Sequence, residues 1–116
     1  MLEISKYPNT EKLLEEINNN LDPFTAWLDA DPISRDLILR KRKPGDRFQP
    51  MGMDGHSKKL ADFFINVKLP KQARKRWPLV CSGDEVIWVP GFRLAHPCLV
   101  REKTSTVLKL VLREKT

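Results

Sequence analysis

The sequence predicts an α+β fold with an antiparallel sheet, and three observations predict it. Short apolar segments separated by turns fill the last forty residues, as in a β-hairpin at 78–89. An apolar stripe at helical spacing lies within 58–68. The chain has 116 residues, of which 41% are hydrophobic, so it can form one core but is too short for a large multi-substrate enzyme.

The first third of the chain is expected to be acidic and helical. Thr10 can cap a helix whose apolar residues, from Leu13 to Ile17, follow helical spacing. A second short segment begins at Asp22-Pro23 and stops at Asp31-Pro32, because the residue before proline disfavours helix. We interpret residues 1–34 as a helical appendage or a linker from a preceding domain, and 35–116 as the main domain.

Residues 35–43 are expected to form a strand with Leu37 and Leu39 on one face and Ile38 and Arg40 on the other. The turn that follows, Lys43-Pro44-Gly45-Asp46, has proline and glycine where a type II turn needs them. Residues 47–56, which contain Pro50, Gly52 and Gly55, are predicted to be a loop.

Two helices are predicted next. Ser57 is the expected N-cap of a helix over 58–68, whose stripe consists of Leu60, Phe63, Phe64 and Val67. Pro70 can be the first residue of a shorter helix. On that helix Lys71, Arg74 and Lys75 would share a face.

The remaining elements are predicted to be strands. Residues 78–82 and 85–89 form the hairpin around Gly83-Asp84, and further extended stretches are expected at 92–95 and 99–101. Residues 106–113 alternate in the manner of a half-buried strand, with Leu108, Leu110 and Leu112 on one face.

Charge is strongly segregated along the chain. The formal net charge is +6, but residues 1–39 carry three bases and eight acids, a net of −5. Residues 40–76 carry twelve bases and three acids, a net of +9, and residues 77–116 add +2. Such segregation is typical of a protein that binds a polyanion.

The basic stretch has the residue types that bind phosphate. Arg40 and Arg42 would project from one face of the predicted strand, and Arg47 follows the turn. Guanidinium groups bind phosphate oxygens through paired hydrogen bonds, and the loop glycines allow the backbone to approach a phosphate. Lys58 and Lys59 would lie at a helix N-terminus, which also favours an anion. The alternative is a solvated basic face without a partner.

Other features point less clearly to function. Phe48 and Trp77 lie beside basic residues, so they are the better candidates among the aromatics for exposure and base stacking. Cys81, His96 and Cys98 supply only three potential metal ligands at poor spacing for zinc, so no metal site is expected. One hypothesis for function is nevertheless a small hydrolase or transferase that uses Cys81 with His96.

The chain is expected to be cytoplasmic. It has no run of about 18 apolar residues that could cross a membrane, and no secretory signal. Its two cysteines are too few for a disulfide scaffold and are expected to be reduced.

The stretch from about 35 to 113 resembles the C-terminal domain of bacterial tRNA(Ile)-lysidine synthetase (TilS). The resemblance rests on R-K-R-K-P-G-D-R-F-Q-P-M-G at 40–52, G-H-S-K-K-L-A-D-F-F at 55–64 and K-L-P-K-Q-A-R-K-R-W-P-L-V at 68–80. It continues through E-V-I-W-V-P-G-F-R at 85–93 and the final strand. It implies a layered fold, similar to a domain of the phenylalanyl-tRNA synthetase β subunit, with a β-sandwich and two to three short helices.

The resemblance also implies a function. Members of this family join lysine to the wobble cytidine of an isoleucine tRNA with ATP, and their C-terminal domain is associated with holding the acceptor-stem side of that tRNA. The catalytic S-G-G-x-D-S loop is not present in this sequence. The chain alone is therefore expected to be non-catalytic and without a cofactor, while ATP and Mg²⁺ belong to the catalytic domain of the parent enzyme.

The expected partners are tRNA(Ile) and the catalytic and middle domains of the same enzyme, and the parent could form a homodimer. The second hypothesis is a structural module that packs on those domains without touching RNA. Carried over from the family motif, the expected nucleic-acid-binding residues are Arg40, Arg42, Arg47, Lys58, Lys59, Lys68, Lys71, Arg74 and Arg76.

Overall fold

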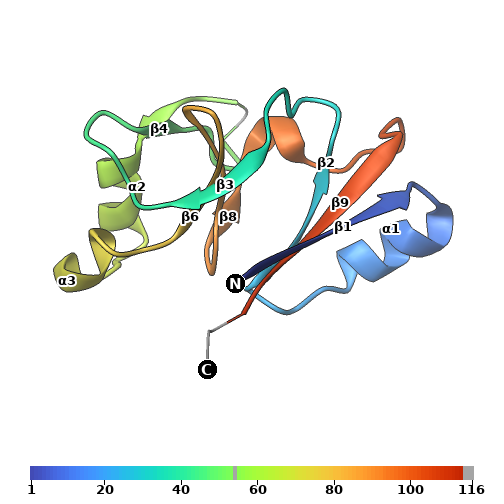
Figure 1. Ribbon diagram of the computed structural model, residues 1–116, viewed down its shortest axis with the longest axis horizontal. Helices are drawn as coiled ribbons and strands as arrows, with labels where there is room; N and C mark the ends of the chain where they lie inside the picture. Colours follow the sequence, from blue (N-terminus) through green and yellow to red (C-terminus); the bar gives the residue numbers. More distant parts are fainter. Residues whose placement is uncertain (54, 114–116) are drawn as a thin grey trace.

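Two antiparallel sheets and a small third one form the computed structural model, which describes residues 1–53 and 55–113 (Figure 1). The first sheet has the order β1-β9-β2 and the second β3-β6-β7-β8, while β4 pairs with β5. The strands are β1 (Leu2–Pro8), β2 (Thr25–Asp29), β3 (Leu37–Arg40), β4 (Arg47–Phe48), β5 (Lys58–Lys59), β6 (Leu79–Ser82), β7 (Glu85–Val89), β8 (Arg93–Leu94) and β9 (Thr106–Leu112).

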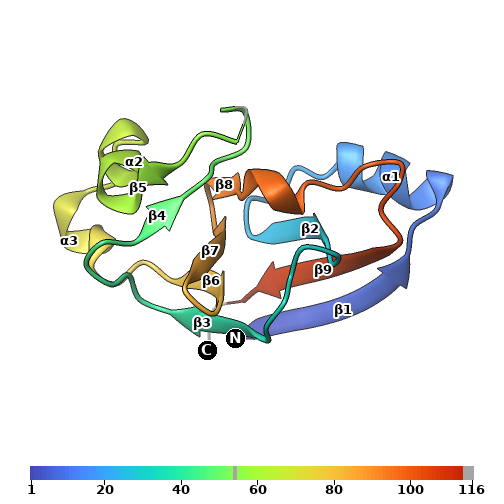
Figure 2. The same cartoon turned by 90° about the horizontal axis from the view of Figure 1, so that it is seen from above.

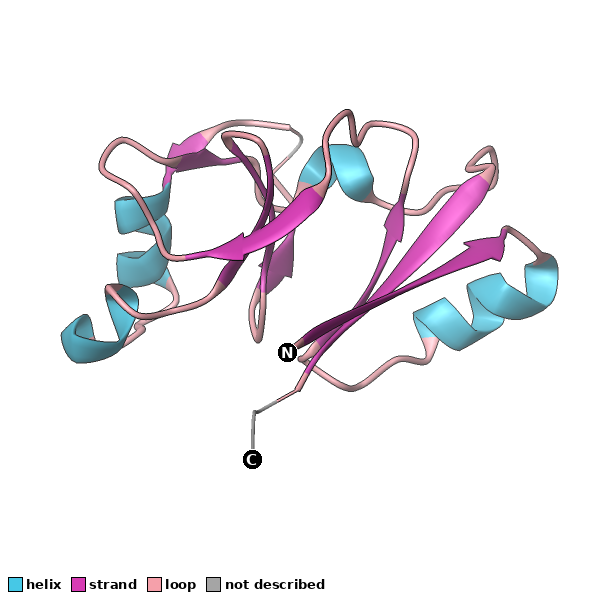
Figure 3. Cartoon of the chain, viewed as in Figure 1, coloured by secondary structure: helices cyan, strands magenta, loops and turns pink. Residues whose placement is uncertain are grey.

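Among the described residues, the helices are α1 (Glu11–Asn18), α2 (Leu60–Asn66), α3 (Lys71–Arg74) and the 3₁₀ helix η1 (His96–Cys98). Figure 3 shows α2 and α3 at one end of the molecule and α1 at the other. The α+β class with antiparallel sheets is therefore confirmed. No helix in the described ranges is long and apolar enough to cross a membrane.

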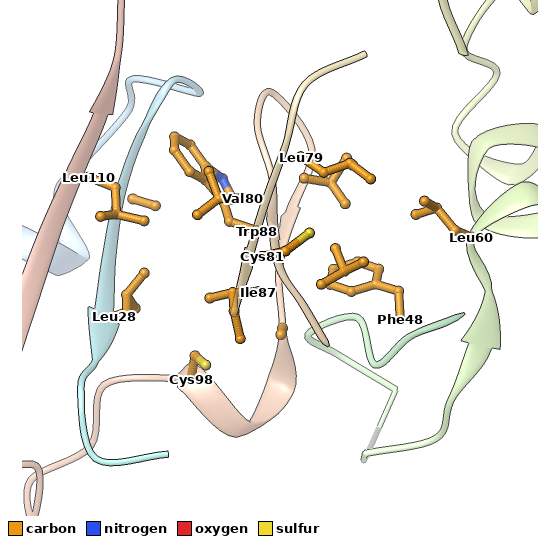
Figure 4. Close-up of a cluster of buried hydrophobic side chains, with 14 of the residues drawn as sticks. Leu28, Phe48, Leu60, Leu79, Val80, Cys81, Ile87, Trp88, Cys98 and Leu110 are labelled. Carbon is orange, nitrogen blue, oxygen red and sulfur yellow. The ribbon is translucent and has the colours of Figure 1, made fainter. Parts of the chain in front are cut away.

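The sheet β3-β6-β7-β8 lies in the middle of a layered core. Side chains from one of its faces, including Val80 and Trp88, meet Leu28 and Leu110 of the first sheet (Figure 4). Leu79, on its other face, points toward Phe48 and Leu60, which come from β4 and α2 (Figure 4). Because both faces are covered, every residue of β6 is buried, which explains why this segment is apolar without alternation.

The strand β9 differs from the prediction of a half-buried strand. Leu110 is buried in the main core, but Val107, which lies on the opposite face, is also fully buried. Val107 packs in a second cluster with Leu13 of α1 and Trp27 of β2. The helix α1 therefore covers the outer face of the first sheet.

The prediction that residues 1–34 are helical is wrong outside α1. Residues 2–8 form β1, which pairs along its whole length with β9, and residues 25–29 form β2 on the other side of β9. Thr10 does cap α1, because its hydroxyl accepts a hydrogen bond from the Leu13 amide at 3.1 Å. Residues 1–34 thus share a sheet with the last strand, and the boundary at residue 34 stays a prediction.

Three local predictions also need correction. The helix α2 begins at Leu60 with Lys59 as its N-cap, because Lys58 and Lys59 pair with β4 instead. Ser57 is not a cap, since its hydroxyl accepts a hydrogen bond from Arg47. Residues 47–56 contain β4 rather than loop alone, and the stretch 99–101, which follows η1, is not a strand.

Candidate nucleic-acid interface

The cations of the segment 40–76 occupy elements at one end of the molecule. Figures 1 and 2 show the β3–β4 loop, β4, β5, α2 and α3 together at the end opposite α1. The residues predicted to bind nucleic acid belong to these elements, to the turns joined to them or, for Arg40, to the end of β3: Arg40, Arg42, Arg47, Lys58, Lys59, Lys68, Lys71, Arg74 and Arg76. How the individual side chains are held differs among them.

Arg40 does not project to solvent beside Arg42, and this prediction is corrected. Its Nη1 and Nη2 donate to the two carboxylate oxygens of Asp46 at 2.9 and 3.0 Å. Only 10% of the Arg40 side chain and 8% of that of Asp46 are exposed. The reason is the turn at 43–46, which folds the chain back so that Asp46 reaches the end of β3.

Asp46 is a nearly buried carboxylate within the basic stretch 40–76. Burial alone would raise its pKa, but hydrogen bonds from Arg40 and from the Lys43 amide outweigh burial and hold the pKa below its usual value. The carboxyl is therefore ionised at neutral pH and neutralised by Arg40. Arg40 thus has a structural role. The negative charge of Asp46 is neutralised by Arg40 and not by the neighbouring cations.

A hollow of about 220 Å³ brings three other cations together. It is lined by Arg42 and Lys43 from the β3–β4 loop and by Lys59 from β5, and Asp46 also lines it. Arg42 is half-buried, while Lys43 and Lys59 are exposed. Lys43 was not among the predicted site residues. Its place directly after Arg42, at the first position of the turn at 43–46, is the sequence signal that could have identified it.

The pair β4–β5 places like charges opposite each other. Arg47 lies directly across from Lys59 in the antiparallel register. Like charges in this arrangement repel each other, and an anion between them relieves the repulsion. Arg47 is fixed by a hydrogen bond from its Nε to the Ser57 hydroxyl at 2.9 Å. Lys58 lies opposite the buried Phe48 and is half-buried.

A further group of cations lies on the turn after α2, on α3 and just after α3. Arg74 is half-buried and its Nε donates to the Leu69 carbonyl at 2.8 Å. Lys68, Lys71 and Arg76 are exposed around this turn. The short helix α3 is confirmed, with Pro70 just before its first residue.

Within the described ranges, the ion pairs are Arg40–Asp46 and Arg113–Glu3. The other eight predicted binding residues therefore form no ion pair with a described carboxylate. Of the three acids in the segment 40–76, Asp46 is neutralised and Asp62 lies in the first turn of α2. Asp54 lies outside the described residues.

A larger cleft of about 710 Å³ adjoins this region but has mixed charge. Lys43 and Arg47 line one part of it, and Asp84 and Glu85 from the β6–β7 turn line another. The two acids would repel a polyanion, so this cleft is less suited to RNA than the hollow around Arg42.

The two aromatic residues that were expected to be exposed, Phe48 and Trp77, are buried or half-buried. Phe48, expected to be exposed, is 2% exposed and meets Phe63 edge-on in the core. Trp77 is half-buried, and its Nε1 donates to the Pro90 carbonyl at 2.9 Å. The expectation that Phe48 is exposed is therefore wrong, and Trp77 is partly packed against the protein.

The two cysteines are poor nucleophiles. Burial raises the pKa of the Cys81 thiol to about 11, and burial does the same for Cys98. Both thiols are therefore protonated at neutral pH, which argues against a reaction that uses Cys81 with His96. Among the residues described, no three His, Cys, Asp or Glu side chains are grouped as a metal site would require.

Comparison with known families identifies one family whose model matches this chain. Residues 37–110 match the family model described as "TilS substrate C-terminal domain". The chain belongs to this TilS C-terminal domain family. The match begins at β3 and ends within β9, so it contains all the predicted binding residues.

Relatives and a solved structure agree with this family. The chain is 38% identical over 102 residues to a tRNA(Ile)-lysidine synthase of Clostridium tetani, covering 85% of this chain and 22% of that protein. It is 42% identical over 90 residues to that of Dehalococcoides mccartyi, covering 78% and 19% respectively. The chain thus spans about a fifth of the length of these relatives.

A structure titled "Crystal structure of TILS C-terminal domain" superposes with a TM-score of 0.67 and 27% identity. The superposition covers 95% of this chain and 82% of that one. The layered fold of a TilS C-terminal domain, expected from the sequence, is therefore confirmed over nearly the whole chain, including strands that precede the matched segment 37–110.

Proposed function

We propose that this TilS C-terminal domain holds tRNA(Ile) for a lysidine synthase through its basic end, which consists of the β3–β4 loop, β4, β5, α2 and α3. The domain contacts the sugar–phosphate backbone on the acceptor-stem side, and another part of the enzyme ligates lysine to the wobble cytidine with ATP in the cytoplasm. The domain itself is non-catalytic. Its role is to bind and position the substrate, with A-form shape rather than base sequence recognised.

The observation that carries this proposal is the set of cations that form no ion pair with a carboxylate in the described ranges. Among the described residues that line the hollow around Arg42, Asp46 is the one acid, and Arg40 neutralises it. Arg42, Lys43 and Lys59 line this hollow without forming an ion pair with a described carboxylate, which favours an anion there. Clefts lined by one sign of charge concentrate the opposite charge and accelerate association.

Fixed guanidinium groups add support. Arg47 and Arg74 each donate through Nε to the protein, to Ser57 and to Leu69 respectively. Such anchoring reduces the side-chain entropy that must be lost when the terminal nitrogens bind phosphate. Nitrogens held in this way suit a rigid backbone such as an A-form stem.

A second candidate function is docking to the rest of the enzyme. The edge strand β3 exposes two large apolar side chains, Ile38 at 46% and Leu39 at 43%. An exposed apolar edge strand is a suitable place for contact with another domain. If docking were the whole function, the isolated chain would not bind tRNA.

The affinity of the isolated chain for a tRNA(Ile) transcript is expected to depend steeply on salt. With about five phosphates neutralised, the logarithm of the association constant should fall by about 4 per logarithm of salt concentration. Affinity should therefore drop by roughly two orders of magnitude between 50 and 200 mM salt. Fluorescence anisotropy with labelled tRNA measures this slope.

A matched duplex DNA of the same sequence as the acceptor stem is the control, because shape recognition predicts that the A-form RNA binds more tightly. A flat response of tRNA affinity to salt, or no binding at all, would contradict the proposal.

A further inference from the structure

The end of α2 has a strained backbone at Lys68. The helix closes with hydrogen bonds from the Leu69 amide to the Phe64 carbonyl and from the Lys68 amide to the Ile65 carbonyl, both 3.0 Å. This pattern needs a left-handed residue after the helix, a position that glycine usually occupies. Lys68 occupies it with a φ of 61°, the one positive φ of a non-glycine residue within the described ranges.

Within the described part of the domain, the two backbone hydrogen bonds of this closing turn hold Lys68 in the left-handed conformation. A left-handed backbone is unfavourable for any L-residue with a Cβ, because that atom crowds the following carbonyl. Lys68 is exposed, and its side chain makes no hydrogen bond or ion pair with a described residue. Glycine would close the helix with less strain, which points to a role for the lysine side chain itself.

The neighbours of Lys68 form a rigid frame. Arg74 donates through Nε to the carbonyl of Leu69, the residue directly after Lys68, which ties α3 to the turn. Lys71 is the first residue of α3 and is exposed. Two ammonium groups and the terminal nitrogens of one guanidinium are therefore presented from a segment of seven residues, 68–74, whose backbone is held in place.

We propose that residues 68–74, which comprise the end of the turn after α2 and the whole of α3, form a preformed clamp for consecutive phosphates of an RNA backbone, in which Lys68 trades domain stability for RNA affinity. The clamp rests on the proposed tRNA-holding function and gives it a second contact point beside the hollow around Arg42. Its ligand is the phosphodiester backbone, so it does not read base sequence.

The other explanation for Lys68 is local. A cation at a helix C-terminus interacts favourably with the partial negative charge there, so lysine at this position could stabilise α2 itself. The two explanations predict opposite effects of Lys68→Gly on stability. If the charge stabilises the helix, the glycine variant melts at a lower temperature than the wild type, whereas relief of strain raises the melting temperature.

The experiment compares Lys68→Gly and Lys68→Gln with the wild-type chain and with Lys103→Gln, which removes an exposed charge from the turn before β9. Thermal unfolding and tRNA(Ile) anisotropy are measured on each. Lys68→Gly should raise Tm by about 3–6 °C through relief of strain. Both Lys68 variants should weaken tRNA binding about fivefold to tenfold and reduce the salt slope by about one.

Lys68→Gln retains the strained backbone, so its Tm should stay within about 2 °C of the wild type. Lys103→Gln should change tRNA affinity by less than twofold. The clamp is refuted if Lys68→Gly binds tRNA with wild-type affinity and slope, or if it melts below the wild type. A wild-type chain that shows no salt-dependent tRNA binding would instead overturn the proposed function and the clamp together.

Discussion

Reversing two charges at the basic end, by Arg42→Glu with Lys71→Glu, is expected to weaken tRNA binding at least about a hundredfold without unfolding the domain. Arg42 lines the hollow beside Lys43 and Lys59, and Lys71 lies on α3. Each reversal removes a phosphate contact and adds repulsion, and about 1.4 kcal/mol per site corresponds to tenfold in affinity. Anisotropy at constant salt measures the loss.

These two residues suit the test because neither side chain forms an ion pair with a described residue. Arg74 is less suitable, since its Nε hydrogen bond to Leu69 ties the turn together and its loss would mix stability with binding. The double variant should therefore unfold within about 1 kcal/mol of the wild type, as surface substitutions usually do.

The matched control for net charge is Lys6→Glu with Lys103→Glu. Lys6 lies on β1 and Lys103 in the turn before β9, and both are exposed. The control changes the total charge by the same four units, so a general electrostatic effect would weaken both variants equally. A control that loses as much affinity as Arg42→Glu with Lys71→Glu would contradict a localised binding surface.

Replacing Arg40 by methionine is expected to destabilise the domain by about 2–4 kcal/mol, because it leaves the Asp46 carboxylate charged and nearly buried without its partner. The Arg40–Asp46 pair forms two hydrogen bonds, and only 8% of the Asp46 side chain is exposed. Asp46 also accepts from the Lys43 amide at 2.7 Å, and its backbone carbonyl accepts from the Leu60 amide. Loss of the pair should therefore loosen the turn at 43–46 and the start of α2. Urea unfolding measures the change.

The same pair predicts a pH dependence. The folded pKa of Asp46 is below its unfolded value, so the stabilisation is fully present above the unfolded pKa of about 3.9 and is lost as the pH falls through the folded pKa. Asp46→Asn should remove this acidic component from the curve of unfolding free energy against pH. Equal urea midpoints for Arg40→Met and the wild type at pH 7 would show that the pair contributes nothing.

Local patterns in the sequence predict much of this fold. The hairpin of β6 and β7, the turn at 43–46, the buried stripe of α2 and the final strand all follow from periodicity and from turn residues that lie next to each other in the chain. Each of these features depends on interactions within a few residues, which is the range over which sequence patterns are informative.

The errors lie where distant segments meet. The strand β1 is exposed at six of its seven positions, so its sequence has no clear apolar alternation, and only pairing with β9 makes it a strand. Val107 belongs to a face that looks solvent-exposed until α1, nearly one hundred residues earlier, covers it. Tertiary context of this kind overrides local propensity.

The candidate site shows the same division. Charge segregation and a family resemblance place the cations within 40–76, and the structure puts that segment at one end of the molecule. Alternation along a strand could not reveal that Arg40 turns to Asp46, since that pairing depends on the turn at 43–46. Nor could it reveal the left-handed backbone of Lys68, which depends on how α2 ends.

The most direct test of the central claim is to map the RNA contact residue by residue. An ¹⁵N-labelled sample of the chain is titrated with an RNA hairpin that carries the acceptor stem of tRNA(Ile), and backbone amide shifts are followed by NMR. We predict that the largest shifts occur at 41–47, 58–59 and 68–76, with small shifts over α1 and β1. The largest shifts along α1 and β1, or on the exposed edge of β3 alone, would contradict the claim that the basic end holds tRNA.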